Sequence, residues 1–260
     1  MKYGIRNGCL PGTWEEAFAS ATDLGFDGVE LDVGADYREG LLWTAAGRRQ
    51  VAEWAGRGAE LSSTCIGGLW THSFASSDPA VRDRAREATL NTIEANAELG
   101  ARWILLPITP GGDDVDSETG RERWIEGVSA CAAAAAEHKV ELALENVGRG
   151  YGQSAVDLLA IAQAVDSPWV RTYYDYGNGL SLGNDPIAEL NLLGTEWITI
   201  LHAKDPGGPY LGEGNVDHEA VVSTVRQIGY DGYIVLETPS TDDPPEAARR
   251  NLAFLRENFG

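Results

Sequence analysis

The segment ITILHAKD at residues 198–205 places a histidine at the end of an apolar run that is typical of a buried strand. Three further segments have the same form: VELALENV at 140–147, RTYYDYGNG at 171–179 and YIVLET at 233–238. Each run ends in a side chain that can bind a metal ion, and these side chains are Glu145, Asp175, His202 and Glu237. They stand 30, 27 and 35 positions apart, about the length of one strand and one helix.

Strand-like and helix-like segments alternate along the whole chain, which predicts a parallel α/β sheet. We favour closure into a (β/α)8 barrel over an open doubly wound sheet, because no GxGxxG or P-loop signature follows the first strand. A length of 260 residues suits one such barrel, so we expect one domain spanning residues 1–260. The expected strands are 3–6, 27–31, 60–65, 102–107, 140–145, 171–175, 197–202 and 233–237.

Helix starts are marked by capping residues between the expected strands. Capping boxes are expected at Thr13–Glu16 and Thr119–Glu122, with an acidic variant at Ser154–Asp157. Asp-Pro pairs place a capping residue before a proline at the first helical position, and they stand at 78–79, 185–186 and 243–244.

A closed barrel of parallel strands brings its C-terminal strand ends together at one mouth, where the four strand-end side chains can converge. A single glutamate or histidine at a strand end is usually a solvated or capping residue. Four consecutive strands that all end in potential ligands favour a shared site. Three carboxylates and one imidazole suit one divalent ion, with Mn²⁺, Co²⁺ or Mg²⁺ favoured over Zn²⁺.

Four other residues are candidates for contact with a substrate at the same mouth. Lys204 shares the strand face of His202, one step nearer the opening, and could bind an enediolate, a carboxylate or a phosphate. Glu30 ends the second strand, although a loop cap explains it equally well. Asn178 could orient a hydroxyl group or simply form a turn. His72 lies in the third strand–helix loop, where packing is the alternative role.

The charge balance excludes several classes of partner. Acidic residues outnumber basic ones by 40 to 20, which gives a net charge of −20 and a field that repels nucleic acid and anionic membranes. No apolar run approaches the ~20 residues of a membrane span. The first residues lack a signal-like apolar stretch, so we expect a cytoplasmic protein that acts on a small molecule. Whether it forms a homo-oligomer stays open.

The acidic surface carries a testable prediction. If it is an adaptation to a salt-rich cytoplasm, the melting temperature should rise as KCl goes from low to molar concentration, because salt screens the self-repulsion. A melting temperature that is flat or falls with KCl would favour an acidic protein from a GC-rich bacterium.

Several motifs together resemble the xylose isomerase-like barrel superfamily, in its sugar-phosphate isomerase/epimerase branch. They are GFDGVEL, ALEN, YDYGN, LHAKD, GEGNVD and YDGYIVLE, and they extend over nearly the whole chain. The resemblance implies that Glu145, Asp175, His202 and Glu237 bind one divalent metal ion. It also implies that Glu145 and Glu237 form an acid/base pair on opposite faces of the substrate.

One departure from the superfamily is informative. Its apurinic endonucleases hold three zinc ions with many histidines, whereas this chain has four histidines in all. Asn178 stands where those enzymes carry a ligand histidine, so a three-zinc nuclease site is not expected.

The expected activity is that of a metal-dependent isomerase or epimerase of a keto sugar or polyol-derived substrate, acting by proton transfer through an enediolate. A dehydratase of the inosose or keto-sugar type is the nearest alternative, because the same intermediate can expel a β-hydroxyl group. A non-catalytic sugar-binding barrel is a more remote one. The sequence leaves the three open.

Overall fold

Eight strands form a closed barrel in the order β1 to β8 in the computed structural model, which describes residues 1–148, 150–239 and 241–260. The predicted (β/α)8 fold is therefore confirmed, and each strand end differs from the expected one by at most one residue. The strands are β1 (Lys2–Arg6), β2 (Gly28–Asp32), β3 (Glu60–Cys65), β4 (Trp103–Pro107), β5 (Glu141–Glu145), β6 (Val170–Asp175), β7 (Ile198–Ala203) and β8 (Tyr233–Leu236).

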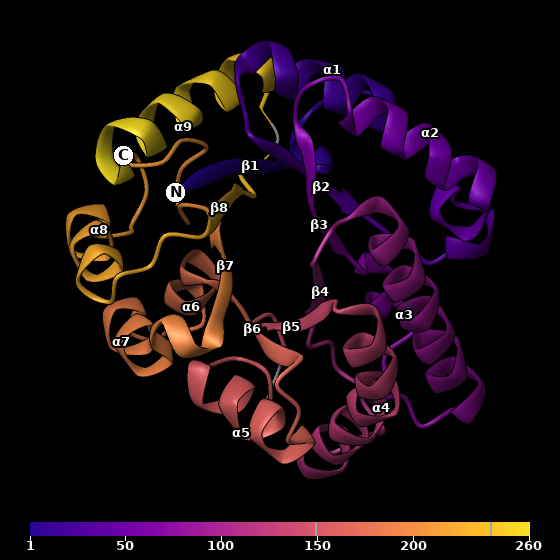
Figure 1. Ribbon diagram of the computed structural model, residues 1–260. Helices are drawn as coiled ribbons and strands as arrows, with labels where there is room; N and C mark the ends of the chain where they lie inside the picture. The colour runs from indigo at the N-terminus through magenta and orange to yellow at the C-terminus, as the bar shows by residue number, and fades with distance from the viewer. Residues whose placement is uncertain (149, 240) are drawn as a thin grey trace. The chain divides into compact units, whose positions relative to one another are not determined.

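The helices follow the strands in the expected alternation (Figure 1). They are α1 (Trp14–Leu24), α2 (Ala45–Ala55), α3 (Pro79–Leu99), α4 (Ser117–His138), α5 (Ala155–Val165), α6 (Tyr176–Ser181), α7 (Pro186–Trp197), α8 (His218–Gln227) and α9 (Pro244–Phe259). Short 3₁₀ turns are η1 (Asn7–Cys9), η2 (Tyr37–Glu39), η3 (Leu41–Trp43) and η4 (Gly67–Trp70).

The capping predictions are confirmed at five helices and wrong at one. Thr13 and Ser154 form capping boxes, and the three Asp-Pro pairs begin α3, α7 and α9. The expected box at Thr119 fails, because α4 begins earlier, after Asp116. The Asp116 carboxylate accepts hydrogen bonds from both the amide and the hydroxyl of Thr119, which makes Thr119 part of the first turn.

The chain packs as two compact units. The first contains Met1–Leu31, Glu53–Ser62 and Tyr173–Gly260. In it β1 pairs with β2 and β8, β8 pairs with β7, and α9 packs beside α1 (Figure 1). Ile5, Val29 and Ile234 are fully buried in this unit.

The second unit contains Asp32–Ala52 and Ser63–Thr172. Here β4 pairs with β3 and β5, and the long helices α3 and α4 pack against each other (Figure 1). Its core includes Trp124, whose indole N–H donates to the Thr109 carbonyl at 2.9 Å and whose ring meets Phe74 edge-on. The expectation of a single domain over residues 1–260 stays a prediction.

Candidate metal centre

His202 is held in one orientation by a buried carboxylate. Its Nε2 atom lies 3.0 Å from Oε1 of Glu30, and both side chains are almost fully buried. The Tyr173 hydroxyl donates to the other Glu30 oxygen at 2.7 Å, and the Tyr173 ring packs against the imidazole. Burial acts to raise the pKa of Glu30, but His202, Arg6 and Tyr173 together lower it, so Glu30 stays ionised. Because a carboxylate only accepts, we assign a proton to Nε2, and Nδ1 is then the ring nitrogen that could bind a metal ion.

Two carboxylates present one oxygen each to this Nδ1 atom. Asp175 Oδ2 lies 3.9 Å from Nδ1 and Glu237 Oε2 lies 3.6 Å from it. The other oxygen of each carboxylate has a separate partner. Asp175 Oδ1 accepts the Asn178 amide at 2.7 Å as the N-cap of α6, and Glu237 Oε1 accepts from the Arg6 guanidinium. The anchored oxygens fix both side chains, and the remaining oxygens converge with the imidazole.

The cationic side chains of Lys204 and Arg6 balance the negative charge of Asp175 and Glu237. The Lys204 ammonium lies 2.9 Å from Asp175 Oδ2 and 2.5 Å from Glu237 Oε2. Burial alone would raise the pKa of Glu237, but His202, Lys204 and Arg6 lower it to about 2, so this carboxylate is ionised at neutral pH. For Asp175, complete burial outweighs the attraction of Lys204 and raises the pKa.

Glu145 is the last residue of β5, where it is buried and stands opposite Pro107 of β4. Among the described residues, Glu145, Asp175, His202 and Glu237 form a candidate metal-binding group. Each offers one ligand atom, and these atoms lie within 4.8 Å of one another. These are the four residues that the strand-end pattern singled out, and their role as metal ligands stays a prediction.

The donor set fits a divalent ion. It offers three carboxylates and one imidazole whose lone pair is oriented by a hydrogen-bonded glutamate, an arrangement typical of metal-binding histidines. Hard oxygen donors with a single nitrogen favour ions of the Mn²⁺, Co²⁺ or Mg²⁺ kind.

The sequence matches the family model described as xylose isomerase-like TIM barrel over residues 18–258. The chain belongs to this family. The relationship was expected from the strand-end motifs, and the match covers both compact units.

Two relatives from Escherichia coli strain K12 confirm that the chain is related to sugar epimerases. SgbU is 34% identical over 244 residues, which cover 86% of this chain and 83% of SgbU. UlaE, named as an L-ribulose-5-phosphate 3-epimerase, is 31% identical over 258 residues, which cover 93% of this chain and 89% of UlaE. The chain is therefore an isomerase-class enzyme, as the sequence predicted.

The fold is shared with a solved structure. The structure of the 3-keto-D-glucoside 4-epimerase YcjR from E. coli has a TM-score of 0.85 to this chain. The two are 21% identical, and the alignment covers 99% of each. No helix among the residues that the structure describes is long and apolar enough to cross a membrane.

The four residues expected to contact substrate lie in different surroundings. Lys204 lies beside Asp175 and Glu237, and its ammonium donates a hydrogen bond of 3.0 Å to the Asn178 amide oxygen. Glu30 lies behind His202 with no exposed surface, which favours an orienting role over direct contact. His72 belongs to the second unit, after η4, where its half-buried ring meets Tyr37 edge-on at 6.4 Å.

Sequence reasoning overlooked Arg6 and Tyr173. Arg6 is the last residue of β1 and stands opposite Glu30 in β2, so the strand-end argument would have found it. Tyr173 stands two residues before Asp175 and so shares its strand face. Its hydroxyl bond to Glu30 joins positions 143 residues apart, for which the local sequence gives no signal.

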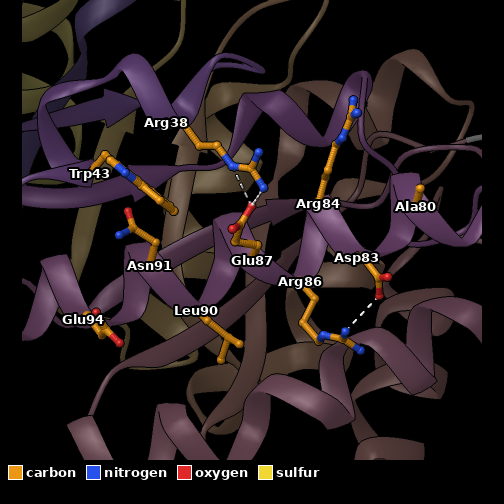
Figure 2. A pocket seen from close by; sticks show the side chains of 10 residues that line it. All are labelled: Arg38, Trp43, Ala80, Asp83, Arg84, Arg86, Glu87, Leu90, Asn91 and Glu94. Carbon is orange, nitrogen blue, oxygen red and sulfur yellow. Dashed lines mark hydrogen bonds and ion pairs between the residues drawn. The ribbon is translucent and has the colours of Figure 1, made fainter.

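The second unit carries a separate surface groove of about 680 Å³ between α3 and the η2–η3 segment. Figure 2 shows two ion pairs among its charged side chains, Arg38 with Glu87 and Arg86 with Asp83. Exposed pairs of this kind neutralise one another and contribute little to stability. The groove therefore offers no set of converging ligands comparable to the metal centre.

Glu30→Gln tests the orienting role of Glu30. An amide can turn its oxygen or its nitrogen toward Nε2, so the imidazole loses its fixed tautomer, and affinity for Mn²⁺ should fall by roughly 10- to 100-fold. Isothermal titration calorimetry measures this directly. Glu189→Gln is the matched control, because Glu189 is also a buried carboxylate that accepts a tyrosine hydroxyl, from Tyr174. Equal Mn²⁺ affinity in the two variants would refute the role.

Proposed function

We propose that this enzyme epimerises a keto sugar at the carbon next to its carbonyl group, with one divalent metal ion bound by Glu145, Asp175, His202 and Glu237. The observation that carries the proposal is the convergence of the His202 Nδ1 atom with one oxygen each of Asp175 and Glu237 in a buried site. The relationship to UlaE, named as a 3-epimerase of a keto sugar phosphate, supports the same reaction class.

A divalent ion bound there supplies a Lewis acid that polarises the substrate carbonyl. Glu237 is ionised because His202, Lys204 and Arg6 lower its pKa, and it is the carboxylate that accepts the α-proton once the substrate is in place. Glu145 acts as its partner and returns a proton to the opposite face of the same carbon. The ammonium of Lys204 provides positive charge for the enediolate that forms between the two steps.

The substrate is a small ketose or its phosphate ester. L-Ribulose 5-phosphate and L-ribulose are the first compounds to test, each with Mn²⁺, Co²⁺ or Mg²⁺, with products identified by NMR. We expect the C3 epimer of one of them and no reaction after chelation of the metal. Release of water with a deoxy product would instead support a dehydratase, and tight binding without turnover would support a non-catalytic barrel.

Turnover in D₂O should place deuterium at the carbon next to the carbonyl group. Glu145 returns a proton that it has exchanged with solvent between turnovers, so in D₂O it delivers deuterium. Mass spectrometry and NMR of the product measure the label. Unlabelled product, together with two metal ions per chain by elemental analysis, would contradict proton transfer and indicate a hydride shift.

A further inference from the structure

The Lys204 ammonium contacts the two carboxylate oxygens that face His202 Nδ1, the candidate metal ligand. Its Nζ atom lies 2.9 Å from Asp175 Oδ2 and 2.5 Å from Glu237 Oε2. The same two oxygens are those that lie 3.9 and 3.6 Å from His202 Nδ1. The Lys204 ammonium thus contacts two of the carboxylate oxygens that a divalent ion at this site would need as ligands.

Two cations cannot both bind these oxygens fully. Like charges a few ångströms apart repel, and the repulsion is weakly screened in a buried site. Asp175 has no exposed surface, and only 18% of the Glu237 side chain is exposed. Binding of a divalent ion therefore works against the contacts of Lys204.

Lys204 has a third partner, Asn178, which it can keep when a metal ion takes the two carboxylate oxygens. Asn178 Oδ1 accepts from Nζ at 3.0 Å, and the Asn178 side chain is not bound to the metal-facing oxygens. The flexible four-carbon stem of a lysine lets the ammonium shift while the backbone stays in place.

The backbone beside Lys204 is firmly held. The next residue, Asp205, is 1% exposed and bonds His218 Nε2 at 3.0 Å. Its carboxylate also accepts three backbone N–H groups of the loop that leads to α8, from Gly212, Gly214 and Val216. Movement is therefore confined to the side chain.

We propose that Lys204 is an internal cation that competes with the divalent metal ion for Asp175 and Glu237, and that metal binding breaks these two contacts and leaves the ammonium on Asn178, where it is available to substrate oxygens. The inference rests on the proposed function, because it presupposes that these residues bind a metal ion. It adds that Lys204 lowers the affinity of the site for a metal ion and stabilises Asp175 and Glu237 when no metal ion is bound.

Lys204→Met should tighten Mn²⁺ binding by about tenfold or more, because the competing charge is gone while the stem volume is kept. The metal-free variant should melt at a lower temperature than the wild type, since Asp175 and Glu237 lose the counter-charge of Lys204. Its gain in melting temperature on adding Mn²⁺ should be larger. Calorimetry and thermal denaturation after EDTA treatment give these readouts without an activity assay.

Lys2→Met is the matched control. Lys2 also forms an ion pair, with Glu60 at 2.8 Å, but on the exposed surface. The control removes the same charge from a chain of net charge −20, so it reports the general effect of charge on Mn²⁺ affinity. Lys204→Gln serves as a second variant if the methionine variant does not fold.

The wild-type protein provides an independent readout. The chain has three lysines, Lys2, Lys139 and Lys204, so the ¹⁵N-labelled ammonium groups give three NMR signals. Adding Mg²⁺, which is diamagnetic, should shift the Lys204 signal and leave the other two in place.

The outcomes separate the two proposals. If wild type binds Mn²⁺ and Lys204→Met binds it no more tightly than Lys2→Met does, the competition is refuted and the metal-dependent function stands. An unmoved Lys204 signal in Mg²⁺-saturated protein refutes it equally. If neither wild type nor Lys204→Met binds Mn²⁺ or Mg²⁺, the proposed function fails as well.

Discussion

Replacing Glu237 by glutamine is expected to abolish epimerisation, with a loss of about a thousandfold or more in kcat. An amide cannot accept the α-proton, whereas its oxygen can still face the metal ion. Part of the Mn²⁺ affinity should therefore remain. The Arg6 guanidinium and the Lys204 ammonium would both face a neutral group in place of the carboxylate they now contact. Steady-state kinetics on the substrate found by screening and calorimetry with Mn²⁺ measure the two effects separately.

Glu213→Gln is the control for this variant. Glu213 is exposed and pairs with Arg250 at 2.6 Å, so its loss should leave kcat unchanged. The reading of Glu237 as a proton-transfer residue would be untenable if Glu237→Gln kept more than about a tenth of the wild-type kcat.

His202→Ala should lower Mn²⁺ affinity by about a hundredfold or more, because it removes the only nitrogen ligand of the candidate group. It should also destabilise the protein. Glu30 is fully buried and would lose the imidazole that contacts it, and removing one partner of a buried pair costs about 3–5 kcal/mol. Calorimetry measures the affinity, and denaturant unfolding in EDTA measures the stability.

His202→Gln separates the two losses. Its amide nitrogen can replace Nε2 as a donor to Glu30, so much of the stability should return while Mn²⁺ affinity stays low. His138→Ala, at the exposed end of α4, should change neither quantity. Wild-type Mn²⁺ affinity in His202→Ala would remove His202 from the metal centre.

Local patterns in the sequence were sufficient for the architecture. The apolar runs that end at Glu145, Asp175 and His202 form strands β5, β6 and β7, because a parallel strand buried on both faces needs a continuous apolar run. Capping residues predicted most helix starts for the same local reason, since a cap binds backbone groups within one turn. The failure at Thr119 is also local, because two residues in that turn can serve as the cap and Asp116 is the one that does.

The sequence by itself determined that strands carrying potential metal ligands alternate with helices, and a repeating strand–helix spacing is enough to predict that their ends meet. Only the tertiary structure decided which atoms of those residues face one another and could bind a metal ion. The Nδ1 atom of His202 faces Asp175 and Glu237, whereas Nε2 bonds Glu30, 172 positions away. Glu237 is held by Arg6, 231 positions away, and the Glu237 oxygen that faces His202 Nδ1 also contacts the Lys204 ammonium. Hydrogen-bond direction and charge pairing depend on side chains that meet only after the barrel has closed, so no local pattern records them.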